Sequence, residues 1–287
     1  MTTDQSAVPP LFQGLCDDAA IFPPGELPLP QAVPAHRVHR AAWYAELVGP
    51  FLCGAGGLET LIAQVGPAAG ELRIGLIVPT GSTGLAPALH ALAAEPRLLV
   101  AGVEVAADPG VEPAQGVRQV VAAFEQLLPA GAIGAVEVPR GPGVAAALDV
   151  LAGTPYRAKF RTGGTVAAAF PDEFELAGFL LACAERELPF KCTAGLHNAL
   201  RHTDPATGFE HHGFLNVLLA THAAAEGAGR AELADLLAER SGPLLADLAV
   251  KLTESQVSAA RGAFTAFGTC SVLEPLEDLL ALGLISQ

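Results

Sequence analysis

Short apolar runs alternate with longer amphipathic stretches along most of this chain. The runs are rich in β-branched residues, which is typical of strands buried on both faces, and the stretches between them repeat with the period of a helix. Eight runs predict strands, the first within residues 11–22 and the others at 51–53, 72–79, 98–105, 132–138, 157–161, 189–193 and 264–269. Helical patterns lie near 31–48, 58–65, 85–94, 117–128, 144–151, 172–187 and 275–282. Strands that alternate with helices in this way favour a parallel sheet.

Eight strand–helix units in 287 residues match a (βα)8 barrel. We therefore predict an α/β, TIM-barrel-like fold with residues 1–287 in a single domain. Residues 197–262 are long for one connection, and we interpret them as a His-rich loop and a helical insertion between the seventh and eighth strands. Its helical patterns lie near 214–225, 231–239 and 254–261. The alternative, a doubly wound open sheet, needs a glycine-rich phosphate loop after the first strand, and residues 54–57 after the second strand match this only in part.

Composition excludes several classes of protein. Hydrophobic residues make up 51% of the chain and charged residues 16%, which argues against disorder. The formal charge of −14 argues against a nucleic-acid partner and against binding to an anionic membrane. The five cysteines form no CxxC pair, and the first residues lack the pattern of a signal peptide. We expect a cytoplasmic protein whose oligomeric state the sequence leaves open.

Two of the three lysines occupy unusual places. Lys159 and Lys191 lie inside apolar strand patterns, 32 residues apart, which places them on neighbouring strands, whereas Lys251 lies in a polar helical stretch. A buried ammonium group needs a partner or loses its proton. A lysine that has lost its proton is a nucleophile for carbonyl groups.

Two glutamates supply the matching negative charge. Glu104 and Glu137 each stand between valines on the fourth and fifth predicted strands, so alternation turns them to the face opposite those valines. We expect both to face Lys159 and Lys191 inside the barrel, near its mouth, with Arg161 on the same face as Lys159. The alternative interpretation is a purely structural ion network.

The strand segments Lys159-Phe160-Arg161-Thr162-Gly163-Gly164 and Lys191-Cys192-Thr193-Ala194-Gly195 resemble the class I aldolases, most nearly the deoxyribose-phosphate aldolase family. The resemblance covers about residues 155–200. It implies that Lys159 forms the Schiff base, that Lys191 lowers its pKa, and that an acidic residue on an earlier strand transfers protons. It also implies no cofactor or metal, and a substrate phosphate bound by backbone amides at Gly195 and at the turn 268–271. The Phe160-Arg161 pair, Leu196 and the insertion depart from the family pattern.

Further candidates surround these strands. His197 directly follows the seventh strand and is a candidate general acid or base. The substrate-binding candidates are Asp18, Arg161, Thr193, Gly195, Thr269 and Ser271. The residues His202, Asp204, Glu210, His211 and His212 offer an alternative metal site. The stretch 36–40, which reads His-Arg-Val-His-Arg, is either a solvated helix face or a clamp for an anionic group.

Together these features predict a lyase of the aldolase type that acts through an active-site lysine on a small carbonyl compound, with or without a phosphate group. The expected partner is a small anionic or carbonyl molecule. Two alternatives stay open. One is a metal-dependent or acid–base isomerase or hydrolase that uses the loop 197–212. The other is a non-catalytic ligand-binding barrel, because a fold alone does not decide among functions.

Overall fold

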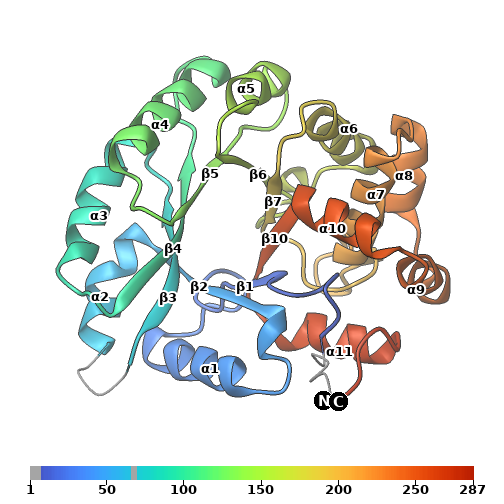
Figure 1. Cartoon of the computed structure of the whole chain (residues 1–287), viewed down its shortest axis with the longest axis horizontal. Coiled ribbons are helices and arrows are strands. Elements are labelled where there is room, and N and C mark those ends of the chain that lie inside the picture. The colour runs from blue at the N-terminus through green and yellow to red at the C-terminus, as the bar shows by residue number, and fades with distance from the viewer. Residues whose placement is uncertain (1–7, 66–69) are drawn as a thin grey trace.

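Apolar strands that are buried on both faces build the centre of the molecule. The computed structural model describes residues 8–65 and 70–287. Eight parallel strands close into a barrel in the order β1-β10-β7-β6-β5-β4-β3-β2 (Figure 1). They are β1 (Cys16–Asp18), β2 (Val48–Gly54), β3 (Leu72–Val78), β4 (Leu98–Ala106), β5 (Ile133–Glu137), β6 (Arg157–Arg161), β7 (Phe190–Thr193) and β10 (Phe264–Thr269). The closed parallel barrel confirms the predicted TIM-barrel-like fold.

Helices follow the strands and surround the barrel (Figure 1). They are α1 (Leu29–Ala41), α2 (Leu58–Gln64), α3 (Leu85–Ala93), α4 (Pro113–Leu127), α5 (Val144–Leu151), α6 (Glu173–Ala184), α7 (Phe214–Ala225) and α11 (Leu273–Ala281). Short 3-10 turns lie at Ala45–Leu47, Ala55–Gly57, Ser82–Gly84 and Ala167–Ala169. None of the helices in residues 8–65 and 70–287 has the length and apolar character needed to cross a membrane.

The segment between β7 and β10 holds more than one connecting helix. It contains a small antiparallel pair, β8 (His202–Thr203) with β9 (Glu210–His211), and then α7, α8 (Arg230–Ala238), α9 (Gly242–Val250) and α10 (Glu254–Ala263). The sequence predicted neither the hairpin nor α9. Strands of two residues carry no periodic signal, and the Gly242-Pro243 pair looks like a helix breaker although proline is tolerated in a first helical turn.

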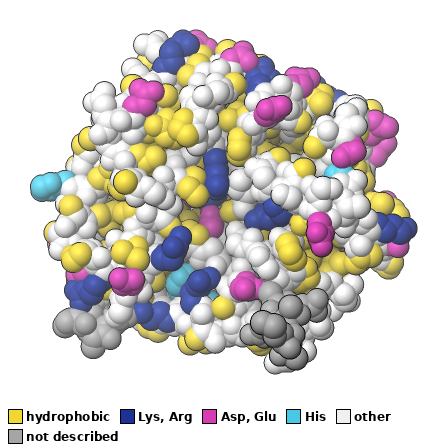
Figure 2. All heavy atoms as spheres, viewed as in Figure 1, with side chains coloured by type: hydrophobic (Ala, Val, Ile, Leu, Met, Phe, Trp, Pro, Cys, Tyr) yellow, Lys and Arg dark blue, Asp and Glu magenta, His cyan; other side chains and the backbone are white. Residues whose placement is uncertain are grey.

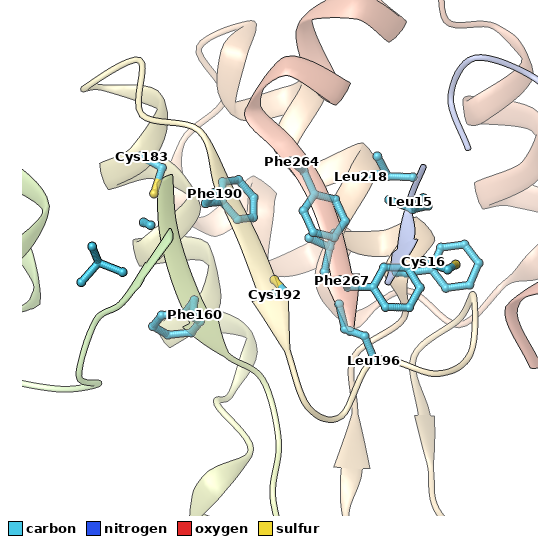
Figure 3. Close-up of a cluster of buried hydrophobic side chains, with 14 of the residues drawn as sticks. Leu15, Cys16, Phe160, Cys183, Phe190, Cys192, Leu196, Leu218, Phe264 and Phe267 are labelled. Carbon is cyan, nitrogen blue, oxygen red and sulfur yellow. The ribbon is translucent and has the colours of Figure 1, made fainter. Parts of the chain in front are cut away.

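The main apolar core lies between the strands and the helices. Figure 3 shows Phe160, Phe190, Phe264 and Phe267 on three neighbouring strands, and the rings of Phe190 and Phe264 stack with centroids 5.2 Å apart. Because side chains alternate along a strand, the residues between these aromatic positions face the inside of the barrel. The outer face is therefore apolar, while Lys159 and Lys191 point inward.

Candidate active site

The strand register brings the inward-facing charged residues together. Lys159 on β6 pairs with Lys191 on β7 and with Glu137 on β5, and Glu104 on β4 pairs with Ala135 on β5. Residues that share one level of a barrel on neighbouring strands lie within reach of one another. The register thus places two lysines and two glutamates at the centre of the barrel.

The contacts form one continuous network. The Nζ atom of Lys159 lies 2.8 Å from Oε2 of Glu104 and 2.9 Å from Oε2 of Glu137. The Nζ atom of Lys191 donates to Oε1 of Glu104 and lies 2.5 Å from Oδ2 of Asp17. Glu104 therefore bridges the two ammonium groups. We call these five residues the lysine–carboxylate network.

Asp17 is the member of the network that sequence reasoning missed. The sequence singled out its neighbour Asp18, but Asp18 turns outward and lies 2.8 Å from Nδ1 of the buried His36 on α1. The period-two alternation of a strand distinguishes the two residues only when the register is known, and the register of the first strand was ambiguous. A Cβ atom at Gly49 would lie 2.1 Å from Oδ1 of Asp17, so glycine on β2 makes room for this carboxylate.

Burial and neighbouring charges shift the pKa values of residues in the network. Burial alone raises the pKa of Glu104, but the ammonium groups of Lys159 and Lys191 outweigh it and lower that pKa to about 2. Burial lowers the pKa of Lys191, but Asp17 and Glu104 outweigh it and raise that pKa well above its usual range. Burial raises the pKa of Asp17. Lys191 and Glu104 are therefore held charged, and Asp17 is more easily protonated than an ordinary aspartate.

The network reaches the carboxyl end of the barrel through Glu137. An Oε1 atom of Glu137 lies 2.9 Å from the Arg161 guanidinium, whose side chain is 44% exposed. Arg161 pairs in register with Thr193, the inward residue at the end of β7. Two of the predicted substrate-binding residues, Arg161 and Thr193, thus lie beside each other at this end. The turns that follow β6 and β7 also lie close together, because a Cβ atom at Gly195 would lie 2.7 Å from the Thr162 carbonyl oxygen.

A second polar group at the carboxyl end centres on His197. Its Nδ1 atom lies 3.0 Å from Oε2 of Glu274, and 3.4 Å from Oγ1 of Thr269. Burial lowers the pKa of His197, but hydrogen bonds with Cys270 and Glu274 outweigh it and raise that pKa to about 9. In the described residues no hydrogen bond or ion pair joins His197 to the lysine–carboxylate network. Ser271 belongs to the same group, since its backbone N–H donates to Thr269 Oγ1 at 3.3 Å.

Histidines of the loop 197–212 form hydrogen bonds within the protein. His212 is fully buried and lies between the Pro171 carbonyl oxygen, 2.8 Å from its Nε2, and the Arg201 guanidinium, 3.1 Å from its Nδ1. Nδ1 of His211 lies 3.2 Å from the Gly195 carbonyl oxygen. Within residues 8–65 and 70–287, no group of three or more His, Cys, Asp or Glu side chains is arranged to hold a metal ion. The loop geometry therefore gives no support to the metal-dependent alternative.

A large cavity lies at the amino end of the barrel, opposite the end where we expected the site. It measures about 1110 Å³ and reaches Asp17, Glu104 and Lys191 of the network. Its walls include the first residues of several strands, such as Arg73 and Arg157. Barrel interiors are usually filled by bulky side chains. Here inner positions near the strand starts carry residues with little or no side chain: Gly49, Gly75, Gly102, Ala135 and Ala266.

Comparisons with protein-family models and with curated proteins find no match to this chain.

Proposed function

We propose that this chain is a lyase of the aldolase type that acts on a small carbonyl compound through Lys159. The observation that carries the proposal is the bridge formed by Glu104, which contacts the ammonium groups of both lysines. A lysine that attacks a carbonyl group needs neighbours that accept and return protons. Glu104 and Glu137, at 2.8 and 2.9 Å from the Lys159 nitrogen, are such neighbours.

We assign different roles to the two lysines. Lys191 keeps its proton because Asp17 and Glu104 hold its pKa high. In this proposal Lys159 is the nucleophilic amine, and Lys191 is the fixed cation beside it. The same assignment follows from the resemblance to the class I aldolases. The substrate approaches from the carboxyl end, where Arg161 and Glu137 cover Lys159.

The reaction proceeds in balanced steps. The neutral Lys159 nitrogen adds to the carbonyl carbon, and the carbonyl oxygen becomes a hydroxyl group that leaves as water after it takes up a proton. The result is a protonated Schiff base. A carboxylate then removes the proton of the substrate's β-hydroxyl group, which becomes the carbonyl group of the departing product as the adjacent carbon–carbon bond breaks and its electron pair moves onto the Schiff-base nitrogen to form an enamine. The enamine carbon takes up a proton from the carboxyl group, and water hydrolyses the resulting Schiff base, which releases the second product and restores the Lys159 amine. Asp17, whose pKa is raised by burial, is the carboxylate of the network that takes up a proton most easily, and it contacts Lys191.

Reductive trapping tests the proposal. The protein is incubated with small aldehydes and ketones, reduced with borohydride, digested and analysed by peptide mass. Lys251 is an internal control because its side chain is 67% exposed and lies outside the barrel interior. We expect an adduct on Lys159 in large excess over Lys251. An adduct on Lys191 alone would reverse the roles of the pair.

One observation favours a second candidate function. The three negative charges of the network carboxylates balance the three positive charges of the two lysines and Arg161. Each lysine has two carboxylate partners. A balanced network also suits a ligand-binding barrel without covalent chemistry. Trapping that yields no adduct on either buried lysine with any carbonyl compound supports that candidate.

A further inference from the structure

The cavity at the amino end of the barrel carries an unusual excess of positive charge. Five arginines and Lys191 line it, against four acidic side chains, in a chain whose formal charge is −14. The arginines are Arg37, Arg40, Arg73, Arg157 and Arg261. Figure 2, viewed as in Figure 1, shows dark blue Lys and Arg side chains around the centre of this face of the molecule. A local reversal of the sign of charge concentrates anions from solution.

Among residues 8–65 and 70–287, no carboxylate forms an ion pair with any of these five arginines. Arg261 donates to the carbonyl oxygens of Gln13, Phe264 and Thr265. Arg40 donates to the carbonyl oxygens of Ala45 and Val48. These bonds orient the guanidinium groups, and the acceptors are neutral carbonyl oxygens.

Arg73 and Arg157 have still fewer partners. Within residues 8–65 and 70–287, neither side chain forms a hydrogen bond or an ion pair. Arg157 is partly buried, and burial lowers its pKa more than the nearby charge of Asp17 raises it. Buried charges are normally paired, which makes an unpaired guanidinium in a cavity wall a candidate for pairing with a ligand.

We propose that this cavity binds a small organic anion that carries two or more negative charges, in the form of phosphate or carboxylate groups. Guanidinium groups bind both kinds of group through paired hydrogen bonds. The volume of about 1110 Å³ is sufficient for a metabolite-sized ligand. This site is separate from the predicted anion site at Gly195 and Ser271, because the cavity lies at the start of the strands and those residues follow their ends.

The stretch 36–40, for which a clamp for an anionic group was one of two interpretations, contributes to this proposed site. Three of its residues, His36, Arg37 and Arg40, line the cavity. His36 itself is buried against Asp18, and the Arg37 side chain donates to the Gly70 carbonyl oxygen at 3.3 Å. This face of α1 therefore forms one wall of the proposed site.

Calorimetric titration with pyrophosphate and with citrate tests the inference, at constant ionic strength set with sodium chloride. We expect both to bind the wild-type protein. We expect Arg73→Gln and Arg157→Gln each to weaken binding by about tenfold, because a charge-assisted hydrogen bond contributes roughly one factor of ten or more. Arg118→Gln, an exposed arginine on α4 outside the cavity, is the matched control and keeps full affinity.

The controls separate this site from the proposed catalytic function. Titration uses no carbonyl compound, so binding succeeds or fails independently of Schiff-base formation. Arg73 is exposed, so its substitution leaves the fold intact, which circular dichroism verifies. The inference is overturned if affinity is unchanged in both arginine variants, or if Ser271→Ala alone abolishes binding. It is also overturned if neither anion binds at constant ionic strength.

Discussion

Glu104 has the most consequential position of any single residue in the barrel. Its carboxylate is 4% exposed and is shared by two ammonium groups. Removing its charge leaves Lys159 with Glu137 alone and Lys191 with Asp17 alone. The stability of the centre of the barrel should therefore depend on this residue whether or not the network is catalytic.

We expect Glu104→Gln to lower the free energy of unfolding by about 3–5 kcal/mol, because it breaks buried ion pairs. Urea denaturation measures this loss. The matched control is Asp247→Asn in the exposed pair with Lys251, where Nζ and Oδ2 are 2.6 Å apart. An exposed pair of this kind contributes at most about 1 kcal/mol. A similarly small loss for Glu104→Gln would show that the network does not stabilise the fold.

The same variant has a characteristic pH dependence. The pKa of Glu104 is about 2 in the folded protein and 4.5 is its ordinary value, so its contribution is present above pH 4.5. That contribution is lost as the pH falls from 4.5 towards 2. The stability difference between wild type and Glu104→Gln should therefore shrink across this interval. A difference that stays constant down to pH 2 would contradict the assignment of the low pKa to Glu104.

At the scale of elements, the sequence predicted the barrel strands well and the small elements poorly. The pattern located β6 and β10 at their observed bounds, because continuous apolar runs with clear ends specify strands buried on both faces. It also predicted α7 at its observed bounds. It missed the β8–β9 hairpin, whose strands are too short to show a period.

The contact of His212 with the loop before α6 gives a prediction at this scale. Burial, and then the charge of Arg201, lowers the pKa of His212 to about 4, so the folded protein holds this imidazole neutral. A depressed histidine pKa stabilises the fold above the ordinary value of 6.5, and the contribution is lost as the pH falls towards 4.

We therefore expect wild-type stability to fall between pH 6.5 and pH 4, and His212→Gln to show a flatter profile over that interval. Thermal unfolding followed across a pH series measures both profiles. His202→Gln is a suitable control, because His202 is only partly buried and lies in the same loop. Parallel profiles for wild type and His212→Gln would contradict the neutral, buried state of His212.

At the scale of the whole molecule, the barrel has two polar ends joined by one network. Lys159, Lys191, Glu104 and Glu137 were named from the sequence, because charged residues inside apolar strands are rare enough to need a cause. The cavity at the amino end could not be predicted in this way. It arises from small inner residues on several strands, such as Gly75 and Ala135, and their common position appears only once the register is known.

The central claim is that Lys159 reacts with carbonyl compounds, and exchange of carbon-bound hydrogen in D2O tests it most directly. A ketone bound as a Schiff base loses a proton from the neighbouring carbon and regains a deuteron, which proton NMR detects as a falling signal. Lys159→Arg keeps the positive charge but removes the nucleophilic amine. Lys251→Arg is the matched control at an exposed site.

We predict that the wild-type protein and Lys251→Arg exchange the ketone signal at the same rate, while Lys159→Arg reduces exchange to the rate without protein. Equal exchange by wild type and Lys159→Arg, or no exchange of any ketone by the wild-type protein, would contradict it.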